Sequence, residues 1–334
     1  MLEDLKYIQL LIVFLINFFF FFNLNRISKK INIFDCPDKK LKVHSKKVFI
    51  GGGIVFYVIF FFIYLSNIFF FDYYFIRIST FLLATLIFLL GLFDDKFKLN
   101  YLYKFFFLTV VLTLLFVTDE SILVNNLRFS FTEYELNLGN YSYFFTLICF
   151  LLFLNSINLF DGINLQCGTY FLLIFTFFYF ITGNYLFLFF LIPIVFFLYM
   201  NFRNKMFLGD SGSLFIAFVV GYFSISLYQK NFFKSDDIII LMIVPGFDMF
   251  RLFVQRILNK ENPFKGDLNH FHHLVKKNYG YFFAVVINIF FVITLITLRF
   301  FFQYSTISLL IIFMFVYLLL FFMLSKIENT KKKI

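Results

Sequence analysis

The 334-residue chain has few charged residues, no tryptophan, three cysteines and four prolines. Charged residues make up 14% of the sequence and hydrophobic residues 62%, and the mean hydropathy is +0.89. This composition excludes a water-soluble domain, in which about a quarter of the residues are charged. The cysteines, Cys36, Cys149 and Cys167, lack the spacing of a zinc site or a disulfide framework. The sequence therefore predicts a polytopic membrane protein.

Apolar segments long enough to cross a bilayer, about 20 residues each, recur along the whole chain. Basic residues follow the first of them without a small-residue cleavage site, so we expect this segment to be retained as a helix. We predict an all-α fold that forms one integral-membrane domain over residues 1–334. The predicted spans, eleven in number, are 7–24, 49–71, 73–93, 102–118, 141–160, 168–183, 185–202, 212–229, 237–257, 280–298 and 300–324.

The Lys and Arg residues are distributed unevenly between the two sides of this arrangement. Most of the 29 basic residues fall in alternate loops, and the positive-inside rule assigns those loops to the cytoplasm. We therefore expect the amino terminus outside and the carboxyl terminus in the cytoplasm. The one sizeable outer loop, 119–140, alternates apolar and polar residues and predicts a short periplasmic β-hairpin. The positive-inside rule accounts for the net charge of +10, so no nucleic-acid partner is expected.

Four polar clusters interrupt the apolar sequence, and the predicted topology places all of them on the cytoplasmic side. Polar groups at membrane depth are costly to bury, so they usually have a function. We therefore predict a single cytoplasm-facing site. The clusters are Asp94-Asp95, Asn155 to Gly162, Gly209 to Ser213 and His270 to His273.

The first cluster is an acidic pair at the carboxyl end of a predicted helix. The helix dipole does not favour a negative charge at that end. Asp94 and Asp95 therefore suit metal binding, phosphate chemistry or proton transfer. On the pair alone, an equally good interpretation is that the two residues only end the span at the interface. Lys104, at the start of the next span, is placed to face them or a phosphate.

The second and third clusters carry oxygen ligands and small residues. Asn155, Asn158 and Asp161 recur every third residue, which puts them on one broad side of a helix end. Their oxygens suit Mg²⁺, although interhelical hydrogen bonding by the Asn side chains is an alternative. Asp210 and Ser211 precede a span, where free backbone amides favour a phosphate or a carboxylate-held cation; the alternative is that they only cap the helix.

The fourth cluster contains three of the four histidines in the chain. His270, His272 and His273 lie beside lysines, and no cysteine is near. Imidazoles beside lysines favour a diphosphate over zinc, which is the alternative. In the preceding span, Asp248, Arg251 and Gln255 share one helix face, which predicts a polar stripe turned towards the same pocket.

The clusters also carry a resemblance to a known family when they are taken in order. They resemble the polyprenyl-phosphate N-acetylhexosamine-1-phosphate transferases, glycosyltransferase family 4, and most closely its WecA-like branch, which is related to MraY. The motifs that carry the resemblance are Gly51-Gly52, Asp94-Asp95, Asn155-x-x-Asn158-x-x-Asp161-Gly162-Ile163, Phe207 to Ser213, Pro263-Phe264 and His270-Phe271-His272-His273-Leu274.

The resemblance implies a membrane transferase of the bacterial inner membrane. Such an enzyme transfers a sugar 1-phosphate, here most plausibly GlcNAc-1-phosphate, from a UDP-N-acetylhexosamine to polyprenyl (undecaprenyl) phosphate and releases UMP. This reaction starts lipid-linked glycan synthesis for the cell surface, such as cell wall or lipopolysaccharide. The implied cofactor is Mg²⁺, with Mn²⁺ as an alternative, and a homodimer is among the implied assemblies.

The resemblance also implies a role for each matched residue. Asp94 and Asp95 are the implied catalytic residues that act on the lipid phosphate, and Asn158 and Asp210 are the implied metal ligands. The implied substrate-binding residues are Lys104, Asn155, Asp161, His270, His272 and His273.

Three positions depart from the family pattern. Lys98 stands where a third acidic residue is common, Asn164-Leu165 replaces Asp-Gly, and Leu268-Asn269 replaces a basic residue common just before the histidine motif. These changes leave the donor sugar open. Two other functions stay as alternatives: an MraY-like phospho-N-acetylmuramoyl-pentapeptide transferase, and an ion-coupled transporter. The sequence leaves direct attack by the lipid phosphate and a covalent aspartyl intermediate equally open.

Overall fold

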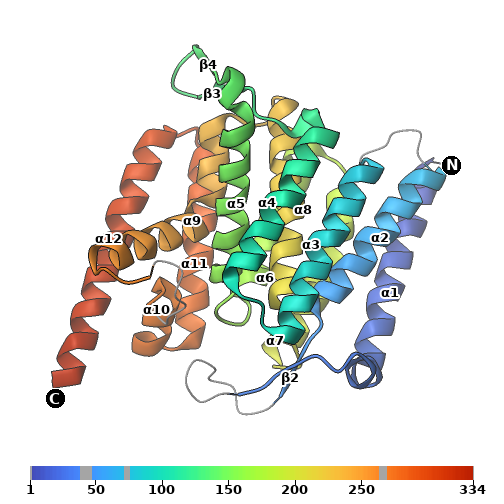
Figure 1. Cartoon of the computed structure of the whole chain (residues 1–334), viewed down its shortest axis with the longest axis horizontal. Helices are drawn as coiled ribbons and strands as arrows, with labels where there is room; N and C mark the ends of the chain where they lie inside the picture. Colours follow the sequence, from blue (N-terminus) through green and yellow to red (C-terminus); the bar gives the residue numbers. More distant parts are fainter. Residues whose placement is uncertain (1, 38–46, 71–75, 263–268, 334) are drawn as a thin grey trace.

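The computed structural model describes residues 2–37, 47–70, 76–262 and 269–333 of the chain. Pro263-Phe264 and Leu268 lie outside these residues. The described helices form one bundle, with the two ends of the chain at opposite ends of it (Figure 1). The α-helices are α1 (Leu2–Ile31), α2 (Gly52–Phe70), α3 (Ile78–Phe97), α4 (Tyr101–Thr118), α5 (Ser142–Phe160), α6 (Gln166–Thr182), α7 (Leu186–Phe202), α8 (Gly209–Gln229), α9 (Ser235–Leu258), α10 (Phe271–Tyr279), α11 (Tyr281–Ile296) and α12 (Thr306–Lys333).

Within the described residues, seven helices are long and apolar enough to cross a membrane. They belong to α1, α3, α4, α5, α8, α11 and α12. The apolar helices in α2, α6 and α7 are shorter, and α9 carries charged residues along its length. The chain is thus an all-α polytopic membrane protein, as predicted, whereas the number of eleven spans stays a prediction.

Helix α8 lies in the middle of the bundle and packs against α2, α3 and α5. Its membrane-spanning window is 94% buried, compared with 22% for α12. Two glycines on neighbouring helices allow the close approach: a Cβ at Gly91 would lie 2.4 Å from Cα of Ser211, and one at Gly53 would lie 2.5 Å from the Gly212 nitrogen. Small residues permit such close packing between membrane helices. The first turn of α8 is therefore fixed between α2 and α3.

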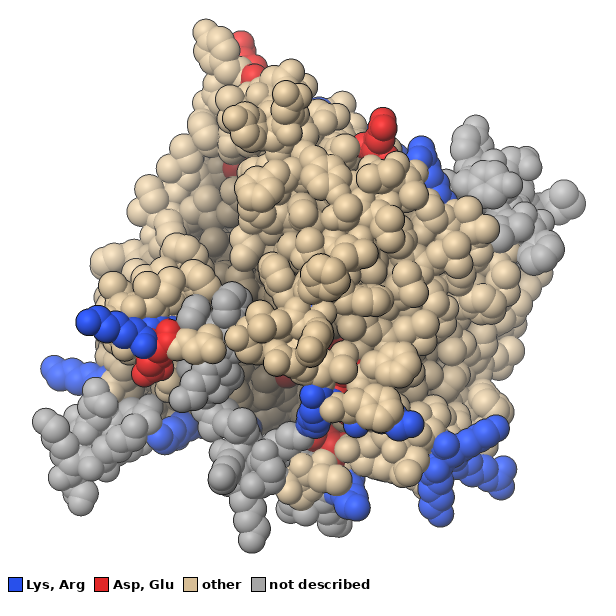
Figure 2. Space-filling view, in the orientation of Figure 1, with Lys and Arg blue, Asp and Glu red and all other residues tan. Residues whose placement is uncertain are grey.

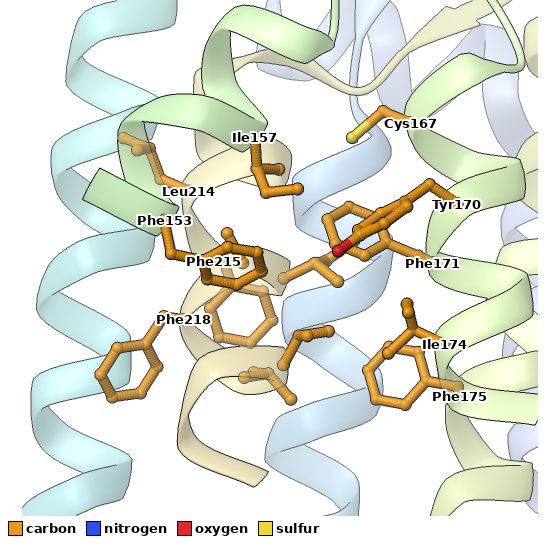
Figure 3. Close-up of a cluster of buried hydrophobic side chains, with 14 of the residues drawn as sticks. Phe153, Ile157, Cys167, Tyr170, Phe171, Ile174, Phe175, Leu214, Phe215 and Phe218 are labelled. Atoms are coloured by element: carbon orange, nitrogen blue, oxygen red, sulfur yellow. The ribbon is translucent and has the colours of Figure 1, made fainter. Parts of the chain in front are cut away.

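Further along α8, aromatic and aliphatic side chains fill the space between α5, α6 and α8 (Figure 3). Phe171, Phe175 and Phe215 are fully buried there. Tyr170 lies in the same cluster and donates a hydrogen bond from its hydroxyl to the Leu241 carbonyl of α9, at 3.1 Å. A buried hydroxyl in an apolar cluster needs such a partner. The cluster is thus an apolar core that fixes the ends of α5 and α8 relative to one another.

Two small sheets lie at opposite ends of the bundle (Figure 1). In the first, β2 (Val48–Ile50) pairs antiparallel with β1 (Phe34–Asp35) and parallel with β5 (Met206–Phe207). Because β5 directly precedes α8, this sheet fixes the entry to that helix. In the second sheet, β3 (Asn126–Arg128) pairs antiparallel with β4 (Glu135–Asn137) inside the loop 119–140.

Several helix boundaries differ from the prediction. Helix α8 begins at Gly209 rather than at residue 212, so the polar cluster forms its first turn. Residues 271–279 form α10 where a loop was expected, because Phe271, Leu274 and Val275 are buried along one face. Helix α12 begins at Thr306, and a π-helical turn, Thr297–Phe301, precedes it. Short helix-end segments of this kind carry little hydrophobic signal of their own.

Candidate active site

A cavity of about 930 Å³ opens at the end of the bundle where α3 and α5 end and α8 begins. This volume lies in the range of small-molecule sites, roughly 300–1,000 Å³. Most of the Lys and Arg side chains visible in Figure 2 gather at the same end of the molecule. The predicted site residues that line the cavity are Asp94, Asp95, Asp161, Asp210 and His273.

The ammonium group of Lys104 connects three of the polar clusters. Its Nζ lies 2.9 Å from Oδ2 of Asp94 and 3.3 Å from Oδ1 of Asn158, and it also donates a hydrogen bond to the carboxylate of Asp210. These four residues belong to four different helices, α3, α4, α5 and α8. Asn158 in turn donates from Nδ2 to Oγ of Ser213, at 2.9 Å. The structure therefore brings together residues that lie more than a hundred positions apart in the sequence.

The two residues of the acidic pair have different surroundings. Asp94 accepts from Lys104 and from the Leu99 nitrogen, the latter at 2.7 Å. Asp95 instead accepts hydrogen bonds from the backbone nitrogens of Asp210, at 2.8 Å, and of Ser211, at 3.0 Å. Asp95 thus caps the amino end of α8 from a neighbouring helix, where the helix dipole favours a carboxylate. The expectation that these amides are free for a phosphate was wrong, because Asp95 occupies them.

Asp161 ends α5 and lies against the same group of carboxylates. Burial, together with the negative charges of Asp210 and Asp95, raises the pKa of Asp161 to about 8. Desolvation and neighbouring like charges both disfavour the ionised form of a carboxyl. Asp161 is therefore largely protonated at neutral pH without a cation, and a cation bound nearby would favour its ionised form.

The turn after Asp161 packs tightly against the histidine cluster. A Cβ at Gly162 would lie 2.2 Å from Nε2 of His272 and 3.0 Å from Nε2 of His273. Only a residue without a Cβ fits this approach. The turn between α5 and α6 is thus in contact with α10, although the two are separated by more than a hundred residues.

Asn164, where the chain departs from the family pattern, holds the rest of this turn. Its Nδ2 donates to the carbonyl of Asn201, at 2.9 Å, and to Oδ1 of Asn204, at 2.7 Å. The hydroxyl of Tyr281 donates to the Asn164 carbonyl at 2.6 Å. Leu165 follows with a φ of +66°, an uncommon conformation for a residue with a side chain. The wall of the cavity at Asn164 is therefore held by side chains from the end of α7 and the start of α11.

The three histidines do not share one environment. His273 lines the cavity, whereas His270 and His272 are 4% and 1% exposed and lie behind it. Burial and the nearby imidazoles lower the pKa of His272 well below its ordinary value, so its ring is neutral. Among the described residues, Nε2 of His272 has no hydrogen-bond partner. Asn155, in α5, also lies apart from the cavity lining, and its side-chain amide donates to the Leu151 carbonyl of its own helix at 2.8 Å.

The cavity is also lined by basic residues, of which Lys98 and Arg203 were not predicted as site residues. The third, Lys276, is one of the lysines beside the predicted histidine cluster. Burial lowers the pKa of Lys276 from its ordinary value. Lys98 and Arg203 follow helix ends on the side that the positive-inside rule assigned to the cytoplasm. This position was the one feature of the sequence that could have predicted them as site residues. Basic residues there suit the phosphate groups of a substrate.

The donor set of the acidic side fits a divalent cation. Asp94, Asp210 and Asn158 offer carboxylate and amide oxygens, which are the ligands that Mg²⁺ accepts. These oxygens already converge on one cation, the Lys104 ammonium. The carboxyl of Asp161, whose pKa of about 8 leaves it largely protonated at neutral pH, would ionise beside a bound divalent cation. The residues present are therefore compatible with Mg²⁺ beside Lys104.

Apolar helices and a cavity lined by acidic and basic residues define a multi-pass membrane protein with a polar site at one end of its bundle. Comparison with known proteins refines this class. The sequence profile of glycosyl transferase family 4 matches residues 77–228. That segment contains Asp94, Lys104, Asn158 and Asp210.

Curated proteins match over a longer part of the chain. A probable undecaprenyl-phosphate N-acetylglucosaminyl 1-phosphate transferase of Bacillus subtilis is 30% identical over 260 residues, which are 74% of this chain and 71% of that protein. The undecaprenyl-phosphate alpha-N-acetylglucosaminyl 1-phosphate transferases of Salmonella typhi and Escherichia coli K12 are each 26% identical, over 80% of this chain and 76% of their own length. The chain belongs to glycosyl transferase family 4, as its motifs predicted.

Proposed function

We propose that this protein transfers N-acetylglucosamine 1-phosphate from UDP-N-acetylglucosamine to undecaprenyl phosphate in the membrane and releases UMP. The observation that carries the proposal is the Lys104 cluster, in which Asp94, Asn158 and Asp210 converge beside a cavity of about 930 Å³. The names of the Bacillus and Salmonella relatives support the same transferred group and the same acceptor. A phosphotransferase needs both acidic and basic groups at one site, and this cavity has both.

In this reaction, an oxygen of the lipid phosphate attacks the β-phosphorus of the donor. A new P–O bond forms at the β-phosphorus, and the bond between the β-phosphorus and the bridging oxygen breaks, so that UMP leaves with that oxygen. We assign Asp94 to position the lipid phosphate and accept its proton, since its Oδ2 contacts the Lys104 ammonium, whereas both oxygens of Asp95 accept from backbone amides of α8. This difference favours direct attack over an aspartyl intermediate at Asp95.

We assign Asp210 and Asn158 as ligands of Mg²⁺, and Asp161 as a residue near the nucleotide. When bound, Mg²⁺ would neutralise phosphate charge and stabilise the leaving UMP. Lys104 already neutralises part of the carboxylate charge at this point. His273 and Lys276 lie on the cavity wall and are assigned to the donor diphosphate.

We propose that the cavity faces the cytoplasm, with the amino terminus and the β3–β4 loop outside. Basic residues gather at the cavity end of the bundle, and the β3–β4 sheet lies at the other end (Figures 1 and 2). Eleven spans satisfy this orientation, with α2, α6 and α7 as the shorter ones and α9 as one that carries charged residues. A cysteine placed at Thr132 should react with a membrane-impermeant maleimide in intact cells; reaction only after lysis would contradict the orientation.

Release of UMP by the purified protein tests the proposed reaction. We expect UMP from UDP-N-acetylglucosamine only when undecaprenyl phosphate and Mg²⁺ are both present. Omission of the lipid, and chelation followed by re-addition of Mg²⁺, are the controls. A panel of other UDP-sugars in the same assay establishes the donor. No UMP from any UDP-sugar, with the protein folded and the lipid present, would exclude the proposed activity.

A further inference from the structure

The carboxylate of Asp248, in α9, lies at the centre of a buried hydrogen-bond network outside the cavity. Its Oδ2 lies 2.8 Å from Nδ1 of His270. Its Oδ1 accepts from the Tyr317 hydroxyl at 2.5 Å, from the Phe271 nitrogen at 3.1 Å and from the Arg251 guanidinium at 2.8 Å. Asp248 is only 4% exposed. The network connects α9 with α12 and with the start of α10.

Arg251 fixes the same segment from a second direction. Besides Asp248, it donates to the Asn269 carbonyl at 2.9 Å and to Oε1 of Gln255 at 3.1 Å, and it lies over the Phe321 ring at 4.0 Å. The polar stripe predicted on α9 is thus present, but its residues contact one another and the segment before α10, and they are not part of the cavity lining. Its members therefore act on the cavity through other residues.

The contact between Asp248 and His270 determines which nitrogen of the neutral imidazole carries the hydrogen. Because a carboxylate only accepts hydrogen bonds, Nδ1 of His270 carries the hydrogen and donates it to Asp248, and Nε2 carries none. The backbone bond from Phe271 to the same carboxylate holds the first turn of α10. The Asp248 carboxylate therefore holds both the His270 ring and the first turn of α10, and Arg251 supports it through the Asn269 carbonyl.

Helix α10 carries this orientation to the cavity. His272, in its first turn, lies against Gly162, and His273 and Lys276 line the cavity itself. Since His272 is 1% exposed and packs against the turn after Asp161, a shift of α10 would move the cavity wall on two sides. This geometry links Asp248 to the donor side of the site without direct contact.

Asp248, His270 and His272 also place ligand atoms within 4.8 Å of one another, which is a spacing that could suit a metal ion. The contacts of Asp248 argue against that interpretation. A separation of 2.8 Å between Oδ2 and Nδ1 is a hydrogen-bond distance, and the Arg251 guanidinium already neutralises the carboxylate. The cluster is therefore better explained as a hydrogen-bond network.

We infer that Asp248 is a positioning residue: it fixes His270 and the start of α10, and thereby sets where His273 and Lys276 meet the donor and where His272 supports the Gly162 turn. The kinetic part of this inference rests on the proposed function. Outer partners of catalytic or ligating histidines are typically worth roughly 10- to 100-fold in activity or affinity.

The test compares Asp248→Asn with Asp236→Asn, a matched control on the same helix. Asp236 is also buried and accepts hydrogen bonds from Ser130 and Thr306, but it lies at the other end of α9. We expect Asp248→Asn to lower kcat/KM for UDP-N-acetylglucosamine roughly 10- to 100-fold and to leave the KM for undecaprenyl phosphate unchanged. Asp236→Asn should alter neither. Tyr317→Phe, which removes one donor to Asp248, should give a smaller effect in the same direction.

A second measurement does not depend on turnover. Hydrogen exchange of the α10 amides should accelerate in Asp248→Asn and not in Asp236→Asn, whether or not the wild-type protein releases UMP. Unchanged exchange of α10 in Asp248→Asn would overturn the inference, and so would equal kinetic losses in the two Asp→Asn variants. Stoichiometric zinc in the purified wild-type protein, lost in Asp248→Asn, would also overturn it in favour of a metal site. An absence of UMP from the wild-type protein would instead refute the proposed function.

Discussion

The Nζ atom of Lys104 lies 2.9 Å from Oδ2 of Asp94, which joins the start of α4 to the end of α3. Both side chains are 14% exposed, so the ion pair is largely shielded from water. Lys104 also contacts Asn158 and Asp210. Because a partly buried charge without its partner is strongly unfavourable, the four residues depend on one another.

Replacement of Lys104 by Met should therefore reduce the rate severely. We expect UMP release to fall by at least roughly 100-fold, the cost of losing a fixed charge that stabilises a phosphoryl transfer. Lys96→Gln is the matched control, because Lys96 belongs to α3 but is exposed and lies over the Phe97 ring. It should leave the rate unchanged. Similar rates for Lys104→Met and the wild-type protein would rule out the proposed role of Lys104.

The two residues of the acidic pair should respond differently to the same substitution. Asp95→Asn weakens the cap of α8, since an amide has one accepting oxygen for the Asp210 and Ser211 nitrogens. We expect a loss of about 1 kcal/mol in stability, together with lower activity. Asp94→Asn should abolish turnover with a smaller loss of stability, because Lys104 keeps Asn158 and Asp210 as partners. Thermal unfolding in detergent and UMP release, measured side by side, check both outcomes, and an equal loss of stability in the two variants would contradict the division.

Asp210→Asn should change the response to Mg²⁺. If Asp210 is a metal ligand, the Mg²⁺ concentration for half-maximal activity should rise at least roughly 10-fold, by analogy with the loss of weaker outer partners of a metal. Titration of activity with Mg²⁺ in the wild-type and variant proteins measures this. An unchanged Mg²⁺ dependence at full activity would exclude Asp210 from the metal site.

The sequence predicted the class of fold because membrane helices carry a strong local signal. It also placed Asp94, Asp161 and Asp210 at one site, because the positive-inside rule puts their helix ends on one side of the membrane. It could not separate Asp94 from Asp95, since the cap on α8 joins residues 115 or more positions apart. For the same reason, the sequence could not predict that His273 lines the cavity while His270 and His272 are buried. Their burial depends on contacts with Asp248 and Gly162, which lie in a different helix and in a turn.

Gly162→Ala should displace α10 from the turn after Asp161. The new Cβ would lie 2.2 Å from Nε2 of His272, and overpacking of this kind costs roughly 1–3 kcal/mol. We expect a lower kcat/KM for the donor, with partial recovery in the double variant Gly162→Ala, His272→Ala. Gly246→Ala is the control, because no atom lies within 4 Å of a Cβ there. Wild-type kinetics in Gly162→Ala would show that the contact with His272 does not matter.

Asp161 should make the stability of the protein without Mg²⁺ depend on pH. Its pKa is raised to about 8 in the folded protein, compared with about 4 for an unfolded chain. Between these values the folded state binds a proton that the unfolded state has released, so stability falls as the pH rises from 4 to 8 and then levels off. The unfolding temperature, measured in detergent with a chelator from pH 6 to pH 9, should therefore decrease with pH. In Asp161→Asn the residue at this position no longer titrates, so the decrease should be smaller. An identical slope in the two proteins would mean that other groups cause it, and that the negative charges of Asp95 and Asp210 do not act on Asp161 as their positions indicate.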